Sequence, residues 1–184
     1  MPETPDLLYR DALPDALRVL VKEFPREAWA QHQNYTDLIA FWLDRHLSFR
    51  RLLQILDADA QKMLDGGFDP MAYKRRLAQF AGMLINELHG HHQIEDAHYF
   101  PVMAKIDARV SSGFDMLDKD HHALDGLLES MTQRANAVLQ APDDASGFRD
   151  AVGGFHGETL AFEPFLNRHL IDEEDLVVPV LLKY

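Results

Sequence analysis

Hydrophobic residues recur along most of the chain at the spacing of an amphipathic α-helix. Apolar positions three and four residues apart dominate, and the period-two alternation of a β-strand is almost absent. We therefore predict four long helices, over about residues 34–64, 70–103, 111–139 and 146–182. Short connections favour antiparallel neighbours, so the predicted fold class is all-α, an up-down-up-down four-helix bundle.

Turn-forming residues separate these helices. The glycine pair at 66–67 ends the first helix, and Asp69 is expected to cap the second, ahead of Pro70 at its first position. The segment 141–144 separates the third helix from the fourth. Pro164 falls inside the fourth helix, where we expect it to kink the chain or to start a new segment.

The N-terminal part of the chain lies outside this pattern. A leucine repeat that begins at Leu13 indicates a short amphipathic helix, ended near Pro25. We predict an N-terminal extension over residues 1–32 that packs on the bundle, and a bundle domain over residues 33–184. The extension is assigned no chemistry.

The second and fourth predicted helices carry the same stripe of residues, 78 positions apart. In the second helix the stripe leads into His91 and, four residues later, Glu95. In the fourth it leads into His169 and Glu173, and a proline follows in both. The duplication therefore includes polar residues as well as the apolar core.

The first and third predicted helices are related in the same way. An offset of 75 positions aligns His46 with His121, each within its apolar stripe. One helical hairpin has been doubled, and each of the four helices contributes one histidine to the inward face.

The stripes point to bound metal. Residues four apart share a helix face, so Glu95 and Glu173 are expected to project into the core with their histidines. A buried carboxylate needs a compensating charge, and no Lys or Arg occupies a stripe position. Divalent cations supply that charge, and the duplication predicts two ions bridged by the two glutamates.

A count of bonds leaves coordination positions open. Four histidines and two bridging glutamates supply about eight bonds, a solvent-derived oxo or hydroxo bridge adds about two, and two octahedral ions offer about twelve. The remainder would bind a small exogenous ligand. Imidazole with carboxylate favours iron, with manganese or zinc as alternatives. The chain has no cysteine, which excludes thiolate sites.

Composition restricts the partners. The formal charge of -12, with no basic run, disfavours nucleic acid and anionic membranes. No apolar run approaches the roughly 20 residues of a membrane span, and the acidic, proline-containing start does not resemble a signal peptide. We expect a cytoplasmic protein that binds a small exogenous ligand.

Over about residues 34–182 the chain resembles the hemerythrin-like family of HHE cation-binding domains. The segments that carry the resemblance are DRHLSFRRLL, HHQIEDAHYFP, DHHALDGLL and HLIDEEDLVVP. The resemblance implies a four-helix bundle with a non-haem di-iron centre and chemistry around oxygen, nitric oxide, peroxide or iron itself. It implies six metal ligands: His46, His91, Glu95, His121, His169 and Glu173.

Two positions depart from the oxygen-carrying members of that family. Those members have a further histidine four residues after the third-helix one, where this chain has Asp125, which favours a sensor or redox-active site over a reversible carrier. Their fourth-helix carboxylate lies five residues past the histidine, which here is Glu174, whereas the internal repeat favours Glu173.

Other polar residues near the motifs are weaker candidates. His98 lies on the stripe of the second helix and is a candidate for an extra ligand or a lining residue. His89 and His92 point away from the stripe, and we expect them to be solvated or to support the ligands. Three neighbours of the third-helix motif are expected either to hydrogen-bond ligand imidazoles or to face water: Asp120, His122 and Asp125. Additional metal ligation is a further candidate role for four residues: His92, His122, Asp125 and Glu174.

Three functions compete. The leading hypothesis is a di-iron protein that binds or senses oxygen or a related small ligand, or responds to iron or redox state, with any output passing through an unknown protein partner. A peroxide-decomposing or oxygen-activating enzyme is less favoured, because the chain lacks the carboxylate-rich Glu-x-x-His pattern of ferritin-like oxidases. The third is a metal-stabilised protein-interaction module.

Overall fold

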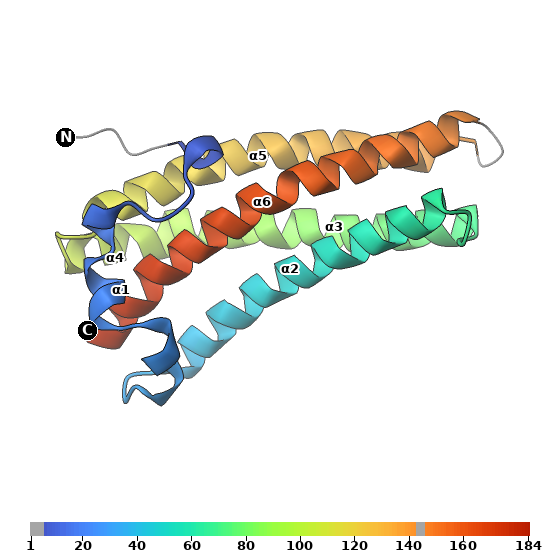
Figure 1. The fold of residues 1–184 in the computed structure, drawn as a ribbon. Helices are drawn as coiled ribbons and strands as arrows, with labels where there is room; N and C mark the ends of the chain where they lie inside the picture. The colour runs from blue at the N-terminus through green and yellow to red at the C-terminus, as the bar shows by residue number, and fades with distance from the viewer. Residues whose placement is uncertain (1–5, 143–145) are drawn as a thin grey trace. The chain divides into compact units, whose positions relative to one another are not determined.

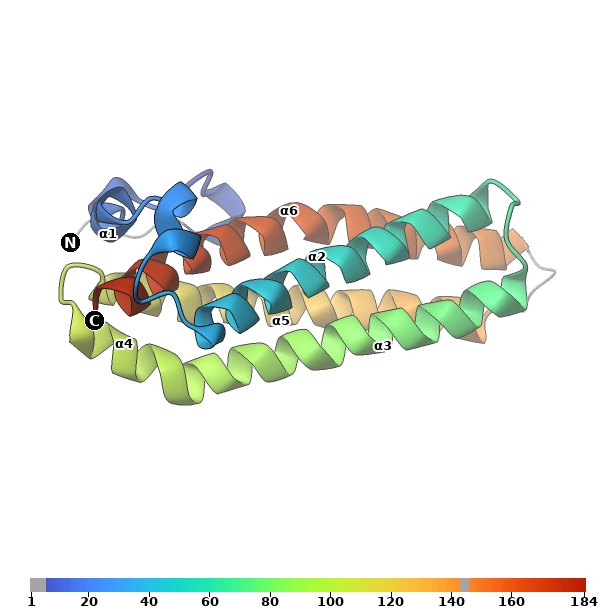
Figure 2. The ribbon, with the colours of Figure 1, turned by 90° about the horizontal axis from the view of Figure 1, so that it is seen from below.

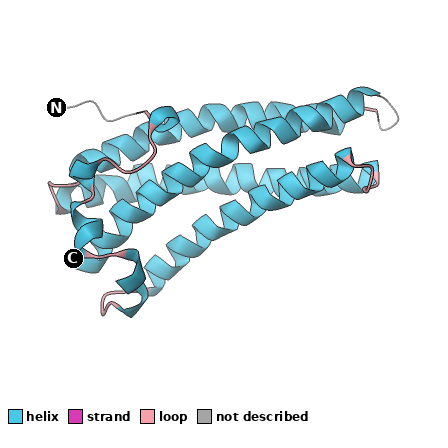
Figure 3. Cartoon of the chain, viewed as in Figure 1, coloured by secondary structure: helices cyan, strands magenta, loops and turns pink. Residues whose placement is uncertain are grey.

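The computed structural model describes residues 6–142 and 146–184, in which all regular elements are helical (Figure 1 and Figure 3). The long helices are α2 (Asp37–Leu64), α3 (Pro70–Ile94), α5 (Ser111–Gln140) and α6 (Ser146–Lys183). The predicted all-α class with four long helices is confirmed. Three of the four helices begin and end within three residues of the predicted bounds.

The second predicted helix is divided in the structure. After α3 the chain forms a π-helical turn, η4 (Glu95–Tyr99), and then α4 (Phe100–Ile106) (Figure 2). In the turn the Phe100 N–H donates to the Glu95 carbonyl oxygen five residues back, so one extra residue is accommodated. Pro101, which has no N–H to donate, follows at once. The helical stripe is therefore displaced after Glu95.

The fourth helix, in contrast, is continuous. α6 runs through Pro164, so the expectation of a new segment there is wrong. Proline removes the donor to the carbonyl oxygen of Leu160, four residues earlier. Both residues lie on an exposed face of the helix, where water reaches that oxygen.

The turn between α2 and α3 follows the predicted chemistry. Gly66 has a φ of 75°, in the left-handed region that glycine adopts readily. The Asp69 side chain accepts a hydrogen bond of 2.8 Å from the Ala72 N–H and so caps α3. The predicted connection at 141–144 lies partly outside the described residues, because 143–145 are not described.

Contacts divide the chain into two compact units, each with segments of all four long helices. The first unit comprises the described part of Met1–Leu47, with His91–Ala123 and Phe165–Tyr184. The second comprises Ser48–Gly90 and the described part of Leu124–Pro164.

In the first unit the N-terminal segment joins the helical core. It forms four short helices: η1 (Leu7–Tyr9), η2 (Asp15–Leu17), α1 (Val19–Glu23) and η3 (Arg26–Gln31). Leu13, Leu17 and Leu20 pack in one cluster with Trp42 and Phe100. The expected helix through the leucine repeat is present as η2 and α1, while the domain boundary at residue 32 stays a prediction.

The second unit has its own core and surface ion pairs. Its helical segments bring Tyr73 against Phe148, with ring centroids 6.5 Å apart. Arg76 pairs with Asp59 at 2.7 Å on its surface. None of the six residues predicted as metal ligands lies in the described part of this unit. Among the described helices, none is both long and apolar enough to cross a bilayer.

Candidate metal centre

The first unit brings the predicted ligands together from all four long helices and from η4. Five of the six are buried, and the sixth, His91, has a side chain that is 12% exposed. They form a continuous cluster with one additional histidine, and the ligand atoms of this cluster fall into two groups.

The first group contains two histidines and two glutamates: His46, His91, Glu95 and Glu173. Their ligand atoms all lie within 4.8 Å of one another. The Nε2 atoms of His46 and His91 are 3.2 Å apart, and Nε2 of His91 is 2.9 Å from Oε1 of Glu95. These imidazole nitrogens and carboxylate oxygens therefore face a shared space.

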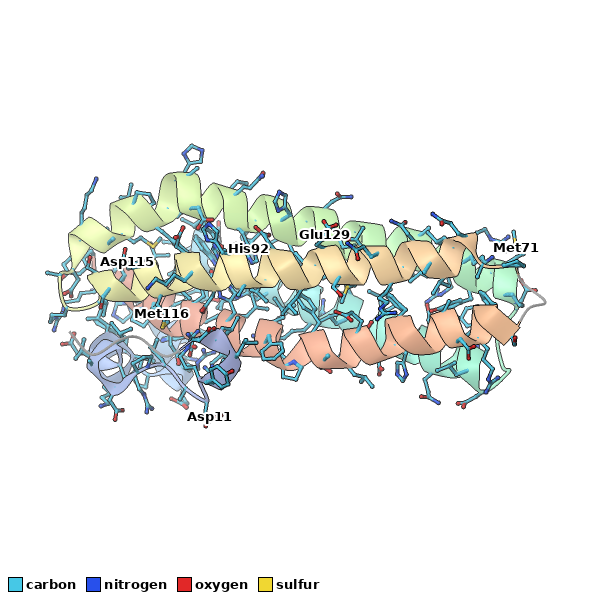
Figure 4. All side chains as sticks on the ribbon, turned by 90° about the horizontal axis from the view of Figure 1, so that it is seen from above. Asp11, Met71, His92, Asp115, Met116 and Glu129 are labelled. Atoms are coloured by element: carbon cyan, nitrogen blue, oxygen red, sulfur yellow. The ribbon has the colours of Figure 1, made fainter. Side chains whose placement is uncertain are left out.

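The second group contains three histidines, His92, His121 and His169, whose ligand atoms also lie within 4.8 Å of one another. The rings of His92 and His121 are stacked, with centroids 3.9 Å apart and an interplanar angle of 11°. His92, labelled in Figure 4, is 2% exposed. Neither of its ring nitrogens has a hydrogen-bond partner among the described residues.

Of the roles expected for His92, exposure to solvent is wrong, because the side chain is buried, and a role in or beside the metal centre stays a prediction. The inward face of a bundle helix is at least about 100° wide, and consecutive residues are about 100° apart. His91 and His92 can both face the interior, and here they meet different neighbours: His91 contacts His46 of α2, and His92 contacts His121 of α5. His89, by contrast, is exposed as expected.

The two glutamates lie between the groups, and each directs one oxygen toward each group. Oε1 of Glu95 lies 2.9 Å from Nε2 of His91, and its Oε2 lies 3.6 Å from Nε2 of His121. Oε1 of Glu173 lies 3.3 Å from Nε2 of His46, and its Oε2 lies 3.5 Å from Nε2 of His169. This placement suits carboxylates that bridge two cations.

A second layer of carboxylates orients the imidazoles. Three histidines place Nδ1 against a carboxylate oxygen: His46 against Glu174 at 3.0 Å, His121 against Asp96 at 2.7 Å and His169 against Asp120 at 3.5 Å. These contacts leave Nε2 of each ring directed at the cluster, which is a common arrangement around metal ligands. The Trp42 indole N–H also donates to Glu173.

Glu173 and Glu174 occupy different places. Glu173 is fully buried, and its carboxylate lies among the Nε2 atoms of the cluster. Glu174 lies on the other side of the His46 ring, against Nδ1. Ligation by Glu173 stays a prediction, but this geometry places Glu174 in a supporting position.

Burial and charge shift the pKa values inside the cluster in opposite directions. Burial tends to lower the pKa of His46, but Glu173 and Glu174 outweigh it and raise the pKa to about 9. Burial lowers the pKa of His91 to about 3, since Glu173 offsets only part of that effect. Burial and the charge of Glu173 raise the pKa of Glu95 well above its ordinary value. Burial therefore favours the neutral form of both His91 and Glu95, whose Nε2 and Oε1 atoms are 2.9 Å apart.

The weaker candidates lie apart from both groups. His98 is exposed, so its expected place on the stripe is wrong, because the π-turn displaces the residues after Glu95. His122 is exposed, and its Nδ1 lies 2.8 Å from the Asp118 carbonyl oxygen. Asp125 is in the second unit, where it pairs with His89 at 3.4 Å.

The sequence reasoning missed two arginines of the N-terminal segment, Arg10 and Arg26. Arg10 pairs with Asp120 and Arg26 with Glu174, two of the carboxylates that contact ligand imidazoles. The sequence signal that could have indicated these arginines was an acidic residue next to a predicted ligand: Asp120 beside His121 and Glu174 beside Glu173. A buried carboxylate requires a partner, and the helical stripes contain no cation to provide it.

Several buried polar atoms of the cluster lack a hydrogen-bond partner among the described residues. Besides both nitrogens of His92, these include Nε2 of His121 and His169, and Oε2 of Glu173 and Glu95. Buried polar atoms are rarely left without partners, and all of these converge on one region. Bound cations would satisfy them together, so the residues fit a two-ion centre.

The fold and this cluster define a class of helical protein with buried histidine and glutamate groups that could bind metal. The family model described as the hemerythrin HHE cation binding domain matches residues 37–181. The chain belongs to this family, as its motifs indicate. No curated protein and no solved structure was found to match the chain.

Proposed function

We propose that the cluster holds two iron ions and that the protein binds or senses oxygen, nitric oxide or peroxide, or responds to iron and redox state. The observation that supports this is the division of the donors: three imidazoles in one group, two in the other, and two carboxylates between them. Nitrogen and oxygen donors without thiolate suit iron. Iron supplies redox chemistry and coordination positions for a small ligand.

His92 changes the expected number of ligands. Asp125 of α5 stands where the oxygen-carrying family members have a further histidine, and it pairs with His89 instead. His92 of α3 offers an imidazole nitrogen to the three-histidine group in its place. Five imidazole bonds and about four carboxylate bonds then fill about nine of roughly twelve positions on two octahedral ions. About three positions remain for solvent and a small ligand.

The surrounding residues orient the donors and exclude water. The Trp42 indole holds Glu173 by a hydrogen bond and packs edge-on against Tyr99, with ring centroids 4.9 Å apart. The Phe100 ring stacks near His121, with centroids 5.4 Å apart. His91 is the most exposed of the six predicted ligands, so we place the entry of a small ligand beside it.

Iron binding and its response to air test the proposal. Protein loaded with Fe2+ without oxygen should bind two ions per chain. On exposure to air it should develop intense charge-transfer absorption in the near ultraviolet, and nitric oxide should produce a different spectrum. Protein that binds no iron, or whose spectrum stays unchanged in air, would contradict the proposal. Continued release of oxygen from peroxide would instead favour an enzyme.

Cation binding should also release protons near pH 7. In the metal-free protein the pKa of His46, raised to about 9, keeps this imidazole protonated near pH 7, and the raised pKa of Glu95 also favours its protonated form. A cation competes with these protons, so its affinity should rise about tenfold per pH unit for each proton displaced, up to about pH 9. Calorimetric titration with Zn2+ in buffers of different ionisation enthalpy measures the number of protons. Binding that is independent of pH between 6 and 9 would contradict this expectation.

A further inference from the structure

Three acidic side chains beside the candidate ligands are buried in the first unit. Asp120 precedes His121 in sequence and is 3% exposed. Asp172 and Glu174 flank Glu173 and are 0% and 6% exposed. Buried carboxylates are costly unless they are paired and hydrogen-bonded. Asp172 pairs with Arg168 of the same helix, but a large part of the compensation comes from the N-terminal segment.

Arg10 joins two of these carboxylates. It lies just after η1 and is 5% exposed. Its Nη1 donates to Oδ1 of Asp120 at 3.2 Å, its Nη2 donates to Oδ2 of the same carboxylate, and its Nε donates to Asp172 at 2.7 Å. Oδ2 of Asp120 also lies 3.5 Å from Nδ1 of His169. A bidentate pair therefore fixes the carboxylate that faces a candidate ligand.

Arg26, at the start of η3, makes the corresponding contacts around the other group. Its Nη1 donates to Oε2 of Glu174 at 2.6 Å, and its Nε donates to Asp175 at 2.7 Å. Its Nη2 donates to the Ile171 carbonyl oxygen at 2.9 Å. The second oxygen of Glu174, Oε1, lies 3.0 Å from Nδ1 of His46.

We propose that the N-terminal segment acts as a clamp on the metal centre, with Arg10 and Arg26 as positioning residues. Each arginine fixes one carboxylate, and each carboxylate orients one imidazole. Arg10 acts through Asp120 on His169 of the three-histidine group, and Arg26 acts through Glu174 on His46 of the other group. This inference rests on the proposed function, because it takes both groups as cation positions.

Each arginine is therefore expected to affect the binding of a different ion. Partners that orient metal-binding histidines typically contribute about 10- to 100-fold to metal affinity. Loss of Arg10 should weaken one binding step, and loss of Arg26 should weaken the other. A purely structural contact would lower the stability of the metal-free protein without this selectivity.

Cobalt titration separates the two roles. The full chain and the variants Arg10→Ala and Arg26→Ala are titrated with Co2+, whose visible absorption reports the number and kind of ligands. Each variant should still bind two ions, but with one step weakened about 10- to 100-fold and an altered cobalt spectrum for that step. Arg18→Ala is the matched control, since Arg18 is 45% exposed and pairs with Asp15 inside the same segment.

Thermal melting of the metal-free proteins is measured in parallel. Arg10→Lys and Arg26→Lys keep the charge but lose the bidentate fork, so they should show partial recovery of affinity and of spectrum. They also provide binding data if an alanine variant does not fold. Variants that melt at lower temperature but bind both Co2+ ions with wild-type affinity and spectrum would overturn the clamp. Wild-type protein that binds no Co2+ or only one would instead contradict the two-ion centre itself.

Discussion

Complete removal of bound cations is expected to lower the melting temperature by about 8–16 °C. Cations present at about 1,000 times their dissociation constant add about 4 kcal/mol to the free energy of unfolding. In a chain of this size, 1 kcal/mol corresponds to roughly 2–4 °C. The effect is large because the cluster links four helices of the first unit and contains buried polar atoms without hydrogen-bond partners in the described part of the chain. Melting curves with and without chelator measure it.

Glu173 provides the most direct variant for this experiment. Its carboxylate lies between the two groups, so Glu173→Gln, which keeps the shape and removes the charge, should abolish most of the cation-dependent shift. Glu163→Gln lies on the same helix but in the second unit, and should leave the shift intact. Equal melting temperatures for the chelated and loaded wild-type protein would show that these ligands contribute little to stability.

Replacement of His92 by phenylalanine is expected to cost the protein one of its two cations. The new ring preserves the volume and the stack on His121 but removes both nitrogens. The affinity of the three-histidine group should fall by about 100-fold or more, since a direct ligand is expected to contribute at least as much as its supporting partners. Metal analysis after dialysis should give a ratio near one ion per chain.

His98→Phe is the control for this substitution. His98 lies in the adjacent π-turn and is exposed, so its replacement should leave two ions bound. The reverse result would be two bound ions in His92→Phe and fewer than two in His98→Phe. It would restore His98 as the extra ligand, which is the assignment that helical spacing alone suggests. The two variants therefore decide whether the additional ligand is His92, which the structure places in the cluster, or His98, which the sequence pattern places on the stripe.

Helical periodicity predicted the fold and the core of the cluster because α3 and α6 keep a regular stripe up to the glutamates. His91 and Glu95, four residues apart, reach one group together, and His169 with Glu173 repeats the relation. The same extrapolation placed His98 incorrectly, because the stripe continues past Glu95 only if the helix stays α-helical. The π-turn begins at that residue.

Other parts of the centre were beyond the reach of periodicity. His92 faces the interior because its helix has neighbours on two sides, which a single stripe does not encode. Arg10 and Arg26 belong to a segment of short helices whose packing on the bundle depends on tertiary contacts. The indirect sign was the number of acidic residues next to the predicted ligands. Once buried, these carboxylates require positively charged side chains from another part of the chain.

Both groups of clustered histidines and glutamates lie in the first unit, which has a practical consequence for labelling. The turn between α2 and α3 belongs to the second unit, and the chain contains no cysteine, so one thiol introduced there would be a unique attachment point. Gly66 is unsuitable because of its positive φ. At Gly67 an added Cβ would meet the Lys62 side chain at an ordinary distance of 3.5 Å. A fluorophore or surface tether at Gly67 would report on the protein from a unit that contains no residue of either group.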